Sequence, residues 1–213
     1  NPDMRVGVLT GAGRGFSAGM DLKQFAEGGL GGMPTVAGRG FAGITEKSCA
    51  KPLIAAVEGF ALAGGLETAL SCDLIVASKG AKLGVPEVGV GLFAGAGALV
   101  RLPRQLPYSI AMEMALTADP ITADVAFQHG MINRLVEKGE AVAVAMELAE
   151  RIARNAPKGV RASKQLLKDV LGVSESDFWE FQRPTMEEVF GSADAIEGAT
   201  AFAEKRRPNF TGE

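Results

Sequence analysis

Residues 55–73, AAVEGFALAGGLETALSCD, decide the predicted fold of the middle of the chain. The run at 52–57 is short and apolar, which predicts a buried strand. A glycine pair then opens a predicted helix at 64–71, and residues 73–77, DLIVA, predict the next strand. A strand, a helix and a strand within thirty residues indicate a βαβ-like crossover in a largely buried parallel sheet.

The N-terminal part of the chain predicts one more strand and a glycine-rich loop. Residues 5–10, RVGVLT, form a short apolar run that Gly11 interrupts, so we expect a strand there. Residues 28–40, GGLGGMPTVAGRG, are rich in glycine and predict a mobile loop, of the kind that can lie over a site.

The C-terminal third of the chain predicts helices. From residue 107 onward apolar residues recur at helical spacing, and residues 177–190 and 193–205 predict two of these helices. The chain therefore predicts an α/β fold, with a core at 1–137 and a helical region at 138–213.

The composition argues against several classes of protein. The chain has 213 residues, of which 47% are hydrophobic, enough for a substantial core. A net charge of −3 gives no basic field that would attract nucleic acid or an anionic membrane. No apolar run reaches the roughly 18 residues of a transmembrane helix. Two cysteines, Cys49 and Cys72, are too few for a disulfide framework, so we expect a cytoplasmic protein.

The single histidine limits the available chemistry. With His129 alone, a metal site built on several histidines is excluded. Little room is left for catalysis by histidine, so acid–base chemistry must fall mainly to carboxylates.

Two glycine motifs near the first strand point to other classes of protein. Residues 11–15, GAGRG, lack the GxGxxG spacing of a dinucleotide site and indicate a flexible turn. Residues 15–19, GFSAG, match the nucleophile elbow of serine hydrolases, with Ser17 as the nucleophile. The predicted strand ends seven residues before this serine, and His129, the one base available, is expected to cap a helix end. A hydrolase is therefore the weaker alternative.

The start of the helix at 64–71 is a candidate anion site. Gly64 and Gly65 leave unpaired N–H groups with no side chain in the way, and the helix dipole adds partial positive charge there. A tight entry turn packed on a strand explains the same glycine pair. Glu67 follows one turn later, either near the same cavity or as a first-turn carboxylate that only complements the dipole.

Glu87 is the second candidate carboxylate. It lies in the apolar, glycine-rich stretch 83–89, LGVPEVG. An acid in such surroundings is either exposed on a turn or partly desolvated with a raised pKa. This stretch alone leaves both alternatives open.

Taken in order, these segments resemble the crotonase family, which comprises enoyl-CoA hydratases and isomerases. The segments that carry the resemblance are VLTGAG at 8–13 with FSAGMDL at 16–22, AAVEGFALAGGLETALSCD at 55–73, LGVPEVGVGLFAGAGALVRLP at 83–103, and AFAEKRRP at 201–208. They follow one another over almost the whole chain, so the resemblance is more specific than any single glycine motif.

The resemblance implies a spiral of ββα units that forms two sheets, followed by a helical trimerisation region. It also implies a trimer or a dimer of trimers. The expected partners are an acyl-CoA thioester substrate and further copies of the chain, with neither nucleic acid nor a membrane. Coenzyme A is part of the substrate, and the resemblance implies no metal and no redox cofactor.

The resemblance also implies roles for individual residues. Glu67 and Glu87 match the two catalytic glutamates, and the N–H groups of Met20 and Gly64 match the oxyanion hole for the thioester carbonyl. Gly95 matches a residue whose amide helps to hold water between the glutamates. The substrate-binding residues would be Ser17, Ala18, Gly19, Asp21 and Leu22, with Phe202 and Lys205 at the phosphate end of CoA, often on a neighbouring subunit.

The implied activity is that of an enoyl-CoA hydratase, a lyase that adds water to a 2-enoyl-CoA. The alternatives within the family are a carnitinyl-CoA dehydratase-like and an enoyl-CoA isomerase activity. The alternatives from other classes are a serine hydrolase at Ser17 and a CoA-binding scaffold without activity.

Four departures from the family pattern are found, three around the acyl pocket and one at the N-terminus. Ala63 replaces the first of three glycines, Ala94 stands where proline is common, and residues 98–100, ALV, replace G-T-Q. These changes leave the identity of the acyl group open. The chain also begins inside the family pattern at Asn1, so we expect that one strand–helix unit precedes it.

Overall fold

The middle of the chain alternates between two sheets. The computed structural model describes residue 1 and residues 3–213, except for the side chain of residue 30. Strand β4 (Leu53–Val57) is followed by β5 (Phe60–Leu62), helix α2 (Gly64–Ser71), β6 (Leu74–Ser78) and β7 (Lys82–Gly84). Successive strands belong to different sheets, since β4 pairs with β6 in parallel and β5 pairs with β7 in parallel.

The larger sheet has the order β1-β4-β6-β9 and the smaller one β5-β7-β8. Strands β1 (Gly7–Thr10), β8 (Ile121–Thr122) and β9 (Arg134–Val136) complete them. In the register of β4 and β6, Ile54 lies opposite Leu74 and Val57 opposite Ala77. The predicted parallel crossover at 52–77 is therefore present, with β5 as an additional strand inside it.

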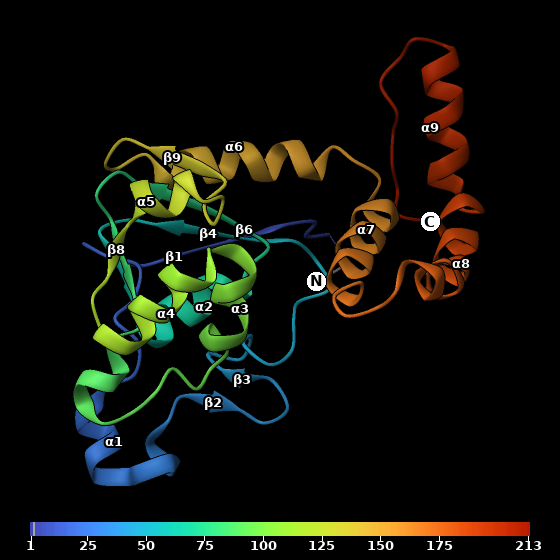
Figure 1. The fold of residues 1–213 in the computed structure, drawn as a ribbon. Helices are drawn as coiled ribbons and strands as arrows, with labels where there is room; N and C mark the ends of the chain where they lie inside the picture. Colours follow the sequence, from blue (N-terminus) through green and yellow to red (C-terminus); the bar gives the residue numbers. More distant parts are fainter. Residues whose placement is uncertain (2) are drawn as a thin grey trace. The chain divides into compact units, whose positions relative to one another are not determined.

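Helix α2 is buried over its whole length. It lies with α3 (Ala98–Gln105) and α4 (Tyr108–Thr117) on one side of the four-stranded sheet (Figure 1). The core joins apolar side chains of β4 and β6 to those of α2, α3 and α4. Because α2 starts directly after β5, its N-terminus is fixed by the smaller sheet.

Two of the predicted segments differ from the structure. The loop expected at 28–40 contains the 3-10 helix η1 (Gly29–Gly32), and strand β2 (Thr35–Val36) pairs there with β3 (Gly40–Phe41). The helical part was expected to begin at residue 107, but α3 already begins at Ala98. Its N-cap Gly97 has a φ of 109°, which favours glycine.

The chain divides into two compact units. One comprises residues 8–49 and 53–147 and holds β2 to β9 with the candidate site; the other comprises 1–7, 50–52 and 148–213. The sequence pattern predicted a different division, with a core at 1–137 and a helical region at 138–213. This division stays a prediction. Among the described residues, no helix has the length and apolar character needed to cross a bilayer.

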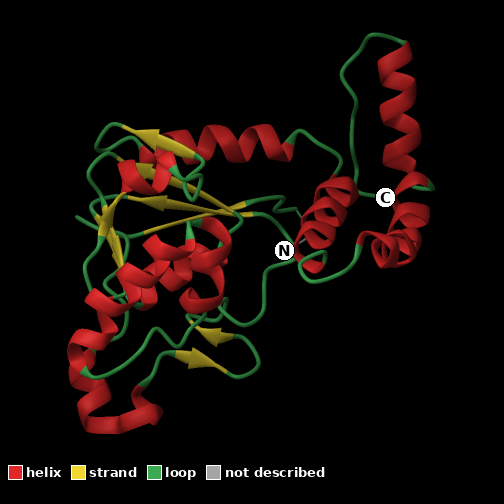
Figure 2. Ribbon diagram, viewed as in Figure 1, coloured by secondary structure: helices red, strands yellow, loops and turns green. Residues whose placement is uncertain are grey.

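The C-terminal part contains helices without strands (Figure 2). Helices α1 (Leu22–Gly28), α5 (Ala123–Gln128) and α6 (Ala141–Ala153) precede α7 (Pro157–Asp169), α8 (Glu175–Phe190) and α9 (Ala193–Ala203). The predicted helices at 177–190 and 193–205 are thus present with small differences at their ends. Ser174 and Ser192 cap α8 and α9 by accepting an N–H bond from the first turn.

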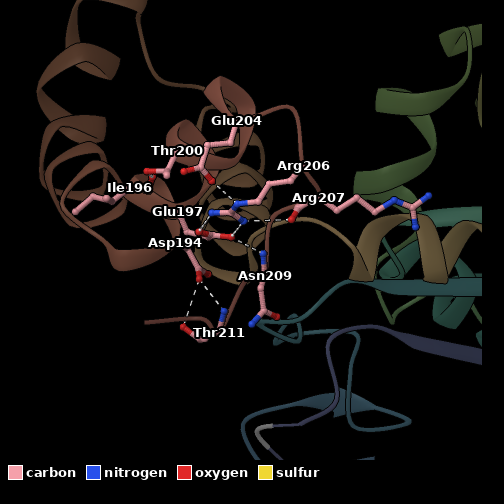
Figure 3. Close-up of polar contacts among 9 residues, drawn as sticks. All are labelled: Asp194, Ile196, Glu197, Thr200, Glu204, Arg206, Arg207, Asn209 and Thr211. Atoms are coloured by element: carbon pink, nitrogen blue, oxygen red, sulfur yellow. Dashed lines mark hydrogen bonds and ion pairs between the residues drawn. The ribbon is translucent and has the colours of Figure 1, made fainter.

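Carboxylates of α9 hold the segment that follows this helix (Figure 3). Asp194 accepts N–H bonds from Thr211 at 2.7 Å and from Gly212 at 2.9 Å. Glu197 accepts two bonds from the Arg206 guanidinium, at 2.6 and 2.8 Å. These bonds lower the pKa of Glu197 to about 2, with a smaller contribution from the N–H of Asn209. In the closing EKRRP segment, Arg206 is therefore paired with the carboxylates of Glu197 and Glu204.

Candidate active site

Glu67 belongs to α2, and its buried carboxylate accepts hydrogen bonds at the start of α3. Its side chain comes from the first turn of α2, and only 3% of the residue is exposed. Oε1 accepts N–H bonds from Ala96 at 2.7 Å and Ala98 at 3.1 Å. Ala98 is the first residue of α3, so Glu67 accepts from an N–H group that has no partner within that helix. These two bonds fix one carboxylate oxygen and leave the other available.

Opposing effects act on the protonation of Glu67. Burial raises the pKa of Glu67 above the usual glutamate value. The N–H groups of Ala98 and Ala96, and then the charge of Arg101, lower it in part. The net shift is upward, and the carboxylate retains donors that stabilise its ionised form.

Glu87 lies in the first turn of the 3-10 helix η2 (Pro86–Val90). Its Oε2 is buried and has no hydrogen-bond partner within the described part of the chain. Burial raises the pKa of Glu87, a bond from its own backbone N–H lowers it in part, and the nearby charge of Glu67 raises it. A buried oxygen without a partner is costly, so this group is suited to hold a proton or to bind water.

Both carboxylates line one cavity of about 380 Å³, which we call the catalytic cavity. Apart from them its lining is apolar. The lining residues are Ala18, Met20, Leu22, Phe25, Met33, Phe41, Ala63, Gly64, Glu67, Pro86, Glu87, Val90, Leu92, Phe93, Gly95 and Ala96. Seven of the residues predicted from the sequence are therefore brought together: Ala18, Met20, Leu22, Gly64, Glu67, Glu87 and Gly95.

The N-terminus of α2 opens into this cavity. Gly64 is the first residue of α2, and neither its N–H nor that of Met20 donates a hydrogen bond within the described part of the chain. Gly19 has a φ of 91°, and a Cβ there would lie 2.8 Å from the Gly64 nitrogen. Only glycine permits this close approach, which brings the backbone before Met20 up to the helix start.

The remaining predicted residues have other surroundings. Ser17 Oγ accepts the N–H of Gly19 at 3.1 Å, and Asp21 caps α1 by accepting from the N–H of Lys23. Both therefore act on the local backbone. Phe202 and Lys205 lie in the other compact unit, where Phe202 is 87% exposed, and their contact with CoA stays a prediction.

The strand, serine and helix of a nucleophile elbow are not continuous here. Strand β1 ends at Thr10 and α1 begins only at Leu22, so Ser17 lies between them in a segment joined to Ala61 by an isolated bridge. His129 is the C-cap of α5, as predicted. The geometry thus lacks the local structure on which the hydrolase alternative depends.

The sequence analysis did not identify Arg101. Its guanidinium donates to the carbonyl of Thr45 at 2.5 Å and to that of Ala96 at 3.3 Å. It therefore holds the loop that presents its N–H groups to Glu67, and its charge acts on the same carboxylate. A Cβ on Gly97 would lie 2.0 Å from Arg101 Nη1, so this arrangement requires glycine there. No sequence pattern indicated that Arg101 points inward.

Comparisons with known proteins agree with this fold. A sequence model of the enoyl-CoA hydratase/isomerase family matches residues 1–213. The carnitinyl-CoA dehydratase of Proteus mirabilis is 40% identical over 218 residues, covering 100% of this chain and 83% of its own. Crystal structures of enoyl-CoA hydratases from Mycobacterium marinum and Mycobacterium tuberculosis are 51% and 49% identical, each with a TM-score of 0.95. Each alignment covers 100% of this chain and 83% of the solved one.

The alternating sheets around a buried helix are those of a crotonase-like α/β fold, with a parallel sheet and a helical C-terminal region. The matches to hydratases and dehydratases indicate an enzyme of the lyase type. The chain belongs to the enoyl-CoA hydratase/isomerase family, as the resemblance of its motifs predicted.

Proposed function

We propose that this protein is an enoyl-CoA hydratase that adds water across the double bond of a 2-enoyl-CoA thioester. The observation that carries the proposal is the pair Glu67 and Glu87. Both are largely desolvated carboxylates in one apolar cavity, and the charge of one raises the pKa of the other. Two glutamates with raised pKa values can perform acid–base chemistry near neutral pH without histidine or metal.

The environments of the two carboxylates assign their roles. Glu67 is stabilised as an anion by two N–H groups and Arg101, so it accepts a proton from water as the oxygen attacks C3. Glu87 has no donor on Oε2, so it holds a proton and delivers it to C2. One proton moves to Glu67 and one leaves Glu87, and exchange between the two groups restores the starting state.

The N–H groups of Met20 and Gly64 form the oxyanion hole of the proposal. Negative charge develops on the thioester oxygen during addition, and each fixed donor aimed at that oxygen stabilises the transition state by about 3–4 kcal/mol. Their freedom from other hydrogen bonds and the position of Gly64 at the start of α2 support this role.

A second candidate is the reverse chemistry, removal of water from a hydroxyacyl-CoA. The 40% identity to a carnitinyl-CoA dehydratase favours this candidate, which uses the same two glutamates. An isomerase is the weaker alternative, because isomerases commonly need one catalytic carboxylate and both Glu67 and Glu87 line this cavity.

A panel of thioesters tests the proposal. We expect water addition to trans-2-enoyl-CoA, which is measured as the loss of absorbance of the conjugated double bond. Conversion of 3-enoyl-CoA should be slower. Turnover of carnitinyl-CoA in preference to simple acyl chains would favour the second candidate. Binding of CoA thioesters without turnover of any of them would overturn the enzymatic proposal.

The proposal includes a trimer or a dimer of trimers in the cytoplasm, with no cofactor besides the CoA of the substrate. The exposed aromatic residues of α8 and α9 support self-association. The low cysteine content, two residues in 213, supports a reducing compartment.

A further inference from the structure

A second apolar cavity lies beside the catalytic cavity. Its volume is about 370 Å³, and we call it the apolar groove. Val85, Leu102 and Ala111 are buried in its wall, whereas Leu116 and Tyr108 are exposed at its edge. Among the residues that the structure describes, no charged side chain lines it. An open apolar cavity of this size suits an alkyl group, since each buried methylene favours binding about fourfold.

One segment, residues 85–96, separates the two cavities. Val85, Val88 and Ala94 line the apolar groove, whereas Pro86, Glu87, Val90, Leu92, Gly95 and Ala96 line the catalytic cavity. Phe93 lines both. Phe93 is therefore the residue that the two cavities share, and it follows Glu87 by six residues.

The ring of Phe93 is held by few neighbours. It is 70% exposed, and no ring contact involving it is found in the described part of the chain. A Cβ on Gly95 would lie 3.6 Å from Phe93 Cε2, so the ring lies near Gly95. Exposed side chains change rotamer within nanoseconds, so rotation of Phe93 can connect the two cavities without backbone movement.

We propose that the apolar groove binds the distal part of the acyl chain of the substrate, and that Phe93 is the specificity-determining side chain at its entrance. The inference rests on the proposed function. It names the substrate class as 2-enoyl-CoA thioesters with long, uncharged acyl chains. The described residues that line the two cavities offer a cationic acyl group no carboxylate besides Glu67 and Glu87, which the chemistry uses.

The test compares a four-carbon with a twelve-carbon trans-2-enoyl-CoA. For each variant we take the ratio of kcat/KM for the long substrate to that for the short one. Ala115→Phe places a ring in the groove and should lower this ratio at least about tenfold, the effect of two or more lost methylene contacts. The matched control Glu113→Phe, on the same helix but outside the groove, should leave the ratio unchanged.

Two further variants test the inference if Ala115→Phe does not fold. Leu116→Glu changes an exposed residue at the edge of the groove and should lower the same ratio by placing a charge beside the chain. Phe93→Trp enlarges the side chain at the entrance and should act in the same direction.

The outcomes separate this inference from the proposed function. Hydration of the four-carbon substrate with a ratio that no groove variant changes would overturn the inference and leave the function standing. A change of sedimentation in Ala115→Phe at a constant ratio would overturn it too, because the groove would then contact a second copy of the chain. If neither substrate is hydrated, both proposals fall.

Discussion

At the scale of single residues, Glu67 and Glu87 should act as one unit. Glu67→Gln or Glu87→Gln keeps the size of the side chain but removes its proton chemistry, so kcat should fall about 100-fold or more. The affinity for a saturated acyl-CoA should change little, because the loss is in the transition state. The double variant should be no more than slightly worse than the worse single one.

Assays of the hydration rate measure kcat, and calorimetry measures the affinity for the saturated acyl-CoA. Glu27→Gln is the matched control, since Glu27 is an exposed carboxylate on α1, a helix that contributes Phe25 to the catalytic cavity. Near-normal hydration by Glu67→Gln would contradict the mechanism with two carboxylates.

Arg101 should set the pH range of activity through Glu67. Its positive charge lowers the pKa of Glu67, whereas burial raises it. Removing the charge in Arg101→Met should therefore raise the pKa of Glu67 further. The ionised base then forms at higher pH, so the acidic limb of the profile of kcat/KM should move upward. Glu67→Gln should lose that limb.

Arg104→Met is the control for this shift. Arg104 is exposed on the same helix, and its charge does not contribute to the pKa of Glu67. If kcat/KM of Arg101→Met falls by the same factor at every pH and the acidic limb does not move, Arg101 has no effect on the pKa of Glu67. Its role would then be the hydrogen bonds to the carbonyls of Thr45 and Ala96.

The sequence predicted the residues that carry a motif and missed those that act through packing. Glu67 stands out because it follows the glycine pair at 64–65 by about one helical turn, and Glu87 because it is a lone acid in an apolar, glycine-rich stretch. Arg101 and Phe93 lie in the motif at 83–103, but this pattern does not indicate what their side chains contact. The surroundings of these two side chains depend on Gly97 and on the way residues 85–96 line both cavities, which are features of the folded chain.

At the scale of elements, the start of α2 joins the oxyanion site to the core. A Cβ on Gly64 would lie 2.6 Å from Phe41 Cζ, so the added methyl of Gly64→Ala must displace a buried ring. The substitution keeps the N–H donor. We expect kcat/KM to fall at least about tenfold, which corresponds to about 1.4 kcal/mol of lost transition-state stabilisation.

A second substitution separates the donor from the ring. In Gly64→Ala with Phe41→Leu, the smaller side chain gives space to the methyl, so the melting temperature should recover towards that of Phe41→Leu alone. Activity that stays low in this double variant indicates a displaced donor or a blocked oxyanion position. Full activity of folded Gly64→Ala would remove the main reason for placing the oxyanion at Gly64.

Elements with a long or well-punctuated pattern were predictable. Helix α2 begins at the predicted glycine pair, and α8 and α9 follow clear helical spacing. Strand β5 was missed because its three residues, Phe60–Leu62, are too few to show a period, and its pairing with β7 is set by the smaller sheet. Strands β8 and β9 were missed for the same reason, since they have two and three residues. The sequence around them was interpreted as helical.

At the scale of the whole molecule, helices α8 and α9 carry several exposed apolar side chains. Trp179 is 55% exposed, Phe190 73% and Ile196 66%, in addition to Phe202. The sequence showed that this segment is rich in aromatic residues, but it could not show whether they pack on their own unit. Their exposure favours the interpretation that they contact further copies of the chain.

We therefore expect the protein to sediment as a trimer or hexamer of its 22.1 kDa chain at micromolar concentration. Phe190→Glu combined with Ile196→Lys places charges on two exposed apolar positions of α8 and α9, so the assembly should dissociate while each chain keeps its helix content. Val142→Glu is the control, an equally polar change at an exposed apolar position of α6 in the unit that holds the site. If Phe202 and Lys205 serve a neighbouring site, dissociation should also weaken binding of CoA at least about tenfold, as loss of a charge-assisted contact to phosphate would. A wild-type protein that sediments as a monomer would exclude the assembly, and a dissociated variant with unchanged affinity for CoA would exclude the shared site.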